Sequence, residues 1–138
     1  MAKNSIAILG DNRLAQNLAE VCAEKGVDAT LLSGIGDLPP TARMVIETVA
    51  SGEKKKSLLQ KLDDFLPASS VIVTSCLGSG VTHLAAGLGK PERIAGFATF
   101  FPLRDRKLIE LAAGLRTAIT AVSAAADFFK SLGKETVT

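Results

Sequence analysis

Two short apolar runs flank an amphipathic segment at the start of the chain, and a glycine marks each boundary between them. Residues 5–9 read SIAIL and lead into Gly10, and residues 12–25 repeat apolar side chains at helical spacing before Gly26. Residues 27–32, VDATLL, form the second apolar run. This pattern predicts a strand, a helix and a strand, which is a βαβ unit. Such a unit requires parallel strands joined by a crossover helix, so it favours an α/β fold.

The same alternation continues along the chain. Further strands are predicted at 43–49, 70–75, 93–100 and 106–113, and further helices at 53–66, from about Val81, and at 116–133. Residues 135–138 are either a last strand or a cut end. Hydrophobic residues make up 47% of the 138 residues, with no Trp or Tyr, so aliphatic side chains must fill the core. The sequence predicts a doubly wound, mostly parallel sheet in a single compact domain spanning residues 1–138.

Charge and cysteine content exclude several classes of function. The formal net charge is +2, and the one basic run, Lys54–Lys56, is interpreted as a solvated helix face, so no nucleic-acid partner is expected. The longest apolar runs are too short to span a bilayer, so no membrane partner is expected. Cys22 and Cys76 lack metal-ligand spacing, and no metal is predicted. Two reduced thiols and the absence of a secretory signal predict a cytoplasmic protein.

Four segments in order carry a family resemblance: residues 6–32, MVIETV at 44–49, SSVIVTSCLGSGVTHLA at 69–85 and KPERIAGFATFFPLRDRKLIELAAGLRT at 90–117. Together they resemble the NAD-binding, Rossmann-like domain of the 3-hydroxyacyl-CoA dehydrogenases. The resemblance implies an oxidoreductase family of fatty acid metabolism with NAD as its cofactor. A closer resemblance is to the degenerate second Rossmann-like domain of long bacterial 3-hydroxyacyl- and 3-hydroxybutyryl-CoA dehydrogenases of the phenylacetate-degradation type. The helical C-terminal domain of the family has no counterpart in these residues.

The cofactor-binding positions depart from the family pattern. Gly10 keeps the first glycine of the G-x-G-x-x-G fingerprint, but Asn12 replaces the middle glycine, which lets the backbone approach the pyrophosphate. Arg13 could partly compensate for that change. Ser33 stands where the family has the Asp that holds the ribose, and Glu47 is either a cofactor-edge carboxylate or a charge at the open end of the sheet. NAD binding is therefore expected to be weak or absent.

The catalytic positions depart further, and none of them is intact. Aligned on the family motif, Ala98 takes the place of the catalytic His and Phe101 that of the Asn, while Glu110 stands at the retained acidic position. Leu77 replaces the substrate-binding Ser. A lone Glu has no imidazole to orient, and His83 is interpreted as a surface residue. These changes predict a pseudoenzyme with a structural or docking role, partnered by other domains of a 3-hydroxyacyl-CoA dehydrogenase or by a second copy.

Two alternatives remain open from the residues alone. Gly10 and the glycines at 78 and 80 could cradle a phosphate, which would make the chain an NAD(H)- or CoA-binding module. Alternatively, the chain is part of an active NAD-dependent 3-hydroxyacyl-CoA dehydrogenase that another domain or chain completes. That alternative requires the partner to supply a histidine near Ala98 and Glu110.

Overall fold

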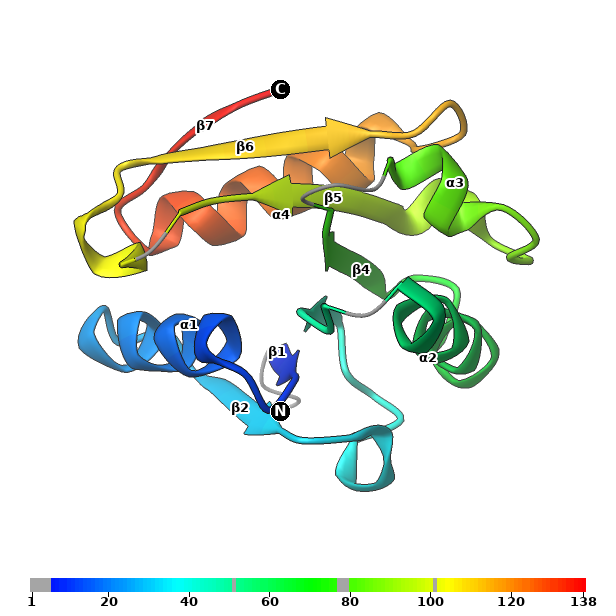
Figure 1. Cartoon of the computed structure of the whole chain (residues 1–138), viewed down its shortest axis with the longest axis horizontal. Helices are drawn as coiled ribbons and strands as arrows, with labels where there is room; N and C mark the ends of the chain where they lie inside the picture. The colour runs from blue at the N-terminus through cyan, green and yellow to red at the C-terminus, as the bar shows by residue number, and fades with distance from the viewer. Residues whose placement is uncertain (1–5, 51, 77–79, 101) are drawn as a thin grey trace.

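A computed structural model describes residues 6–50, 52–76, 80–100 and 102–138, and it contains a seven-stranded sheet in the order β2-β1-β3-β4-β5-β6-β7 (Figure 1). The strands are β1 Ile6–Leu9, β2 Ala29–Leu32, β3 Met44–Glu47, β4 Val71–Ser75, β5 Ile94–Ala98, β6 Leu108–Ala113 and β7 Glu135–Val137. The helices are α1 Arg13–Glu24, α2 Gly52–Phe65, α3 Val81–Ala85 and α4 Ile119–Ser131. All strand pairs are parallel except β5 with β6, which confirms the predicted α/β fold.

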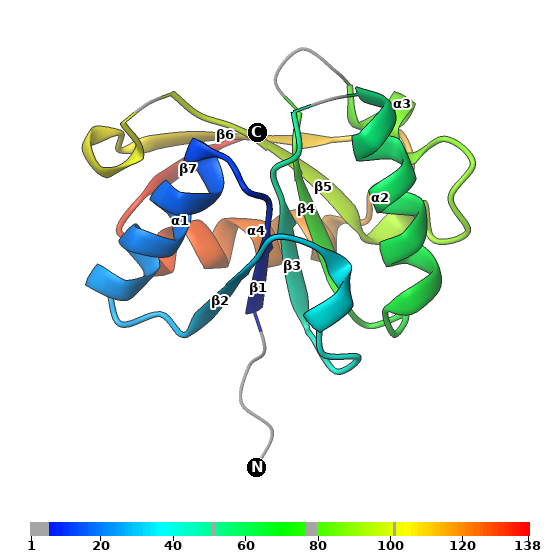
Figure 2. The ribbon, with the colours of Figure 1, turned by 60° about the horizontal axis from the view of Figure 1, so that its bottom comes forward.

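Helices cover both faces of the sheet. Successive side chains along each strand point to opposite faces, so they contribute to two separate hydrophobic cores. Ile8, Ile46 and Phe97 point to one face and pack with α1 and α4. Ala7, Val45 and other inward residues of the opposite face pack with α2 and α3. Figure 2 shows α1 and α4 on one side of the strands and α2 with α3 on the other. The core is therefore divided between two helical layers, and it is not purely aliphatic as predicted, because the first layer also buries Phe97, Phe128 and Phe129.

The chain reverses its winding direction next to β1, which lies between β2 and β3. It leaves β1 through α1 to reach β2, and it then returns past β1 to β3 through a connection that contains only the short 3-10 turn Ile35–Asp37. In open α/β sheets ligands bind beyond the carboxyl ends of the strands at such a switch point. The turn after β1, the segment after β3 and the start of α2 meet there.

The antiparallel pairing of β5 with β6 departs from the predicted alternation of strands and helices. In the described part of the connection between these two strands, the 3-10 turn Leu103–Asp105 is the only helical element, and so short a connection allows a reversal but not a parallel crossover. Burial and a hydrogen bond anchor this turn to the domain: Leu103 is fully buried, and its carbonyl accepts a hydrogen bond from Nζ of Lys134 at 2.7 Å. The reversal places Ala98 directly opposite Glu110. No helix within the described ranges is long and apolar enough to cross a membrane.

Candidate functional site

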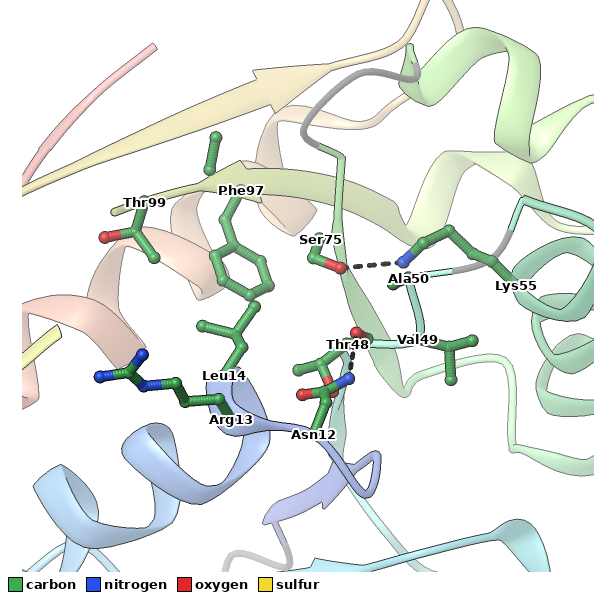
Figure 3. A pocket seen from close by; sticks show the side chains of 11 residues that line it. Asn12, Arg13, Leu14, Thr48, Val49, Ala50, Lys55, Ser75, Phe97 and Thr99 are labelled. Atoms are coloured by element: carbon green, nitrogen blue, oxygen red, sulfur yellow. Dashed lines mark hydrogen bonds between the residues drawn. The ribbon is translucent and has the colours of Figure 1, made fainter. Parts of the chain in front are cut away.

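Asn12 ties the beginning of α1 to the segment that follows β3. It is the N-cap of the helix, with extended backbone, and its Oδ1 accepts a hydrogen bond from the backbone N–H of Ala15 at 2.9 Å. Its Nδ2 donates to the carbonyl oxygen of Thr48 at 2.8 Å (Figure 3). One amide therefore satisfies a free N–H of the helix and a carbonyl beyond β3.

Thr48 completes this connection from the other side. Its side chain is buried, and Oγ1 donates to the carbonyl of Leu9 at 2.8 Å. Gly10 has a φ of +149°, and a Cβ at this position would collide with Oγ1 of Thr48. The first glycine of the fingerprint is thus required both by its backbone conformation and by the threonine that packs on it. We call the contact between Asn12, Thr48 and the end of β1 the crevice latch.

A buried ion pair lies next to the crevice latch, and it corrects the sequence interpretation of Lys54–Lys56 as a solvated face. Lys55 is 4% exposed and Glu47 is 0% exposed, and Nζ of the lysine lies 2.8 and 3.0 Å from the two carboxylate oxygens. Lys54, one position earlier on α2, is exposed. The helix turns Lys55 toward the sheet, where Glu47 compensates its charge. Burial lowers the pKa of Lys55, and the attraction of Glu47 opposes that shift.

Hydroxyl groups surround the ion pair and connect it to the end of β4. Oγ1 of Thr74 donates to Glu47 at 2.5 Å, and the backbone N–H of Val49 donates to the other carboxylate oxygen at 2.5 Å. Nζ of Lys55 donates to Oγ of Ser75 at 2.9 Å and lies 3.2 Å from Oγ1 of Thr74. The carboxylate predicted at the cofactor edge or at the open end of the sheet is therefore enclosed beneath a lysine.

A cavity of about 360 Å³ opens above these groups at the carboxyl end of the sheet. Its lining comprises Asn12, Arg13, Leu14, Thr48, Val49, Ala50, Lys55, Ser75, Phe97, Ala98 and Thr99 (Figure 3). Of the residues predicted to bind a cofactor, Asn12 and Arg13 line it, and Gly10 lies behind Thr48. Ser33 is exposed after β2 and does not line the cavity.

Sequence reasoning missed Thr48, Lys55 and Ser75 as members of the crevice. A signal for Lys55 exists, because it shares a helical face with Leu59 and Leu62, both of which are buried. Polar side chains at the ends of β3 and β4 are also expected at the carboxyl edge of a parallel sheet.

Of the described positions aligned with catalytic residues, Ala98 lines the cavity and Glu110 does not. Ala98 pairs with Glu110 across β5 and β6, and both line a second hollow of about 330 Å³. His83 is exposed on α3, which agrees with its interpretation as a surface residue. Leu77, Gly78 and Phe101 lie outside the described residues, so those three predictions stay predictions. Within the described part of the chain, no three His, Cys, Asp or Glu residues are grouped to hold a metal ion.

The fold and the crevice define a class of protein. A parallel sheet with a switch point beside β1, a glycine turn into α1 and a cavity at the carboxyl edge are features of the Rossmann-like α/β domains. Residues 30–138 match the family model described as "3-hydroxyacyl-CoA dehydrogenase, NAD binding domain". The chain belongs to this family.

Curated relatives and solved structures agree with that assignment. The chain is 34% identical over 97 residues to 3-hydroxyadipyl-CoA dehydrogenase of Escherichia coli K12, covering 70% of this chain and 20% of that protein. It is 33% identical over 113 residues to L-carnitine dehydrogenase of Streptomyces griseus, covering 81% of this chain and 32% of that protein. The chain thus spans a fifth to a third of the length of these relatives.

The solved structures show the same fold at lower identity. The 3-hydroxybutyryl-CoA dehydrogenase of Escherichia coli K12 superimposes with a TM-score of 0.88 at 23% identity, over 99% of this chain and 38% of that one. The (S)-3-hydroxybutyryl-CoA dehydrogenase of Ralstonia eutropha gives a TM-score of 0.89 at 20% identity, over 99% of this chain and 63% of that one. In both cases the dehydrogenase continues well beyond the superimposed part.

Proposed function

We propose that this chain is a degenerate, non-catalytic Rossmann-like domain of the 3-hydroxyacyl-CoA dehydrogenase family, with a structural or docking role. The observation that carries the proposal is the pairing of Ala98 with Glu110 across β5 and β6. Residues that face each other in an antiparallel pair have Cβ atoms about 5 Å apart. A histidine at position 98 would therefore reach the carboxylate at 110, whereas a methyl group can neither accept nor donate a proton.

The crevice latch supports weak or absent binding of NAD, the cofactor of the family. In dinucleotide-binding domains the pyrophosphate approaches the backbone at the middle glycine and accepts hydrogen bonds from the start of the helix. Here the side chain of Asn12 takes that place and already binds the N–H of Ala15. Thr48 fills the space above Gly10. The residues present do not fit a bound pyrophosphate, so no chemical step is assigned to the cofactor.

Exposed apolar side chains beside Glu110 support a docking role. Phe100 is 64% exposed, Leu108 53% and Val137 47%. Val137 pairs with Glu110 across β6 and β7, and Phe100 and Leu108 line the same hollow as Ala98. Large apolar residues gathered on one face mark interaction sites more often than scattered ones do. Because the relatives are longer proteins, the occupant we propose is another domain of a 3-hydroxyacyl-CoA dehydrogenase or a second copy of this chain.

One observation favours the alternative, an NAD(H)- or CoA-binding module or a part of an active enzyme. The cavity of about 360 Å³ lies where the family binds its cofactor, and Arg13 lines it. This alternative requires the crevice latch to open when the ligand enters.

The deciding experiment measures activity and binding with the same protein. The purified chain is incubated with NAD and 3-hydroxybutyryl-CoA, and it is titrated separately with NADH and acetoacetyl-CoA in a calorimeter. We expect no NADH formation and no binding at micromolar ligand. Formation of NADH by the chain alone would refute the non-catalytic role, and micromolar binding without turnover would favour the binding module. Addition of a full-length 3-hydroxyacyl-CoA dehydrogenase then tests for complex formation and for completed activity.

A further inference from the structure

We propose that the crevice between α1 and α2 binds a short oxo carboxylic acid, whose carboxylate accepts a hydrogen bond from Ser75 and whose oxo group pairs with Thr99. This inference goes beyond the proposed function, because it requires neither a dinucleotide nor catalysis. It rests on two hydroxyl groups in the cavity wall: among the described residues, that of Thr99 has no hydrogen-bond partner, and that of Ser75 accepts a hydrogen bond but donates none.

The first hydroxyl belongs to Ser75, and the hydrogen bonds around it show whether it can donate one to a ligand. An ammonium group has three protons, and Lys55 directs them to Glu47 at 2.8 Å, to Ser75 at 2.9 Å and toward the remaining oxygens of the network. The hydroxyl of Thr74 donates its hydrogen bond to Glu47 at 2.5 Å. Ser75 accepts from the lysine, and among the described residues it donates no hydrogen bond. Within the described residues its proton is left for a ligand, and the neighbouring positive charge strengthens it as a donor.

Lys55 lies nearer to the cavity than Glu47 does, and this arrangement favours a ligand with a negatively charged oxygen beside Ser75. Lys55 and Ser75 line the cavity, whereas Glu47 does not line it and is 0% exposed. A ligand oxygen beside Ser75 therefore lies closer to the ammonium than to the carboxylate behind it. Figure 3 shows Nζ of Lys55 directed at Ser75 on the cavity side of α2. The net field at this end of the cavity attracts an anion, and a carboxylate is a small anion that accepts such hydrogen bonds.

The second hydroxyl belongs to Thr99, on the far side of Phe97 from Ser75 (Figure 3). Its Oγ1 is buried and has no hydrogen-bond partner among the described residues, although Thr99 lines the same cavity. An unpaired buried hydroxyl is costly and calls for a partner. A change of χ1 rotamer moves Oγ1 to the place that the methyl group now takes, and from there the hydroxyl can pair with a ligand in the cavity.

The remaining walls set the size and character of the ligand. Leu14, Val49 and Ala98 contribute apolar side chains to the lining, together with the fully buried ring of Phe97. The volume of about 360 Å³ is near the lower limit of small-molecule sites, which run from about 300 to 1,000 Å³. A short carbon chain with a carboxylate at one end and a carbonyl oxygen several bonds away pairs with both hydroxyls, and its methylene groups contact this apolar lining.

Three probes separate the contributions of the two hydroxyls. Binding of 4-oxopentanoate is compared with that of pentanoate, which lacks the oxo group, and of methyl 4-oxopentanoate, which lacks the charge. Affinities come from chemical-shift titration of isotope-labelled protein. We expect 4-oxopentanoate to bind most tightly, with Ser75→Ala weakening both acids by about tenfold. Thr99→Val keeps the shape of the side chain and is expected to weaken only the oxo acid, by a few-fold. Ser57→Ala, on the exposed face of α2, is the matched control.

The outcomes distinguish this proposal from the proposed function. No binding of 4-oxopentanoate at tens of millimolar, or equal affinities in wild type, Ser75→Ala and Thr99→Val, would overturn it. The probe comparison uses wild-type protein, so it decides the question even if a variant fails to fold. Displacement of 4-oxopentanoate by micromolar NADH would contradict the closed dinucleotide site and leave the oxo-acid site standing. Tight binding of the methyl ester would show that the site does not select a carboxylate, which also overturns the proposal.

Discussion

Replacing Lys55 by methionine tests the buried ion pair, because methionine fills similar space without charge. The substitution leaves Glu47, which is 0% exposed, without its counter-ion at 2.8 Å. Loss of one partner from a buried pair costs about 3–5 kcal/mol. Thr74 and the N–H of Val49 still donate to the carboxylate, so we expect the lower end, about 3 kcal/mol. A domain of ordinary stability, about 5–15 kcal/mol, would lose a large fraction of it.

Urea denaturation followed by far-ultraviolet circular dichroism is the suitable assay, since the chain has no Trp or Tyr to report by fluorescence. With a typical urea dependence, a loss of about 3 kcal/mol lowers the midpoint by roughly 1.5 M. Lys54→Met, at the exposed neighbour, is the control and should change stability by less than about 0.5 kcal/mol. The double variant Glu47→Gln/Lys55→Met should recover most of the loss, because no uncompensated charge remains. Equal stability of Lys55→Met and Lys54→Met at pH 7, or no recovery of stability in the double variant, would refute the reasoning.

Three further predictions concern other parts of the molecule. Asn12→Gly removes the hydrogen bond to Thr48 and should cost about 1 kcal/mol of stability while improving NADH binding; unchanged NADH binding in titration would show that the crevice latch is not the barrier. Burial raises the pKa of Cys22 to about 11, so stability is fully present below the ordinary thiol pKa and falls as the pH rises from about 9 to 11, by at most about 3 kcal/mol; denaturation of Cys22→Ala should lack that slope. Phe100→Ser should leave the unfolding midpoint nearly unchanged, because the side chain is 64% exposed, and should weaken any complex with a dehydrogenase partner in sedimentation.

The sheet could be predicted from sequence because each strand carries its own local signal. The apolar runs at β1 and β4 and the glycines after them are visible without any tertiary information. The direction of β6 was less accessible, since it depends on whether the segment before it forms a helix or a turn. Residues 99–107 contain no helical period, and that absence is the signal for an antiparallel return.

The crevice could be predicted only in part, because its contacts join residues that the sheet order brings together. Asn12 stood out as a substitution in a glycine motif, but its partner Thr48 lies 36 positions away. That contact exists because β3 pairs with β1 and so brings the segment after β3 next to the start of α1. The partners Glu47 and Lys55 are eight positions apart, and only the packing of α2 against the sheet turns the lysine toward the carboxylate.

The crevice of this chain satisfies with its own side chains the groups that a bound dinucleotide would satisfy. The helix N–H that would hold a phosphate is bound by Asn12 at 2.9 Å, and the carboxylate at the end of β3 is bound by Lys55 at 2.8 Å. On the proposed function, a domain arranged in this way gains little from the cofactor and loses these contacts if the cofactor enters. The proposal therefore gives stability without ligand and weak dinucleotide binding one physical origin. Among the described residues, the hydroxyl of Thr99 has no hydrogen-bond partner and that of Ser75 only accepts a hydrogen bond, from Lys55, which is why we propose a small ligand between these two hydroxyls.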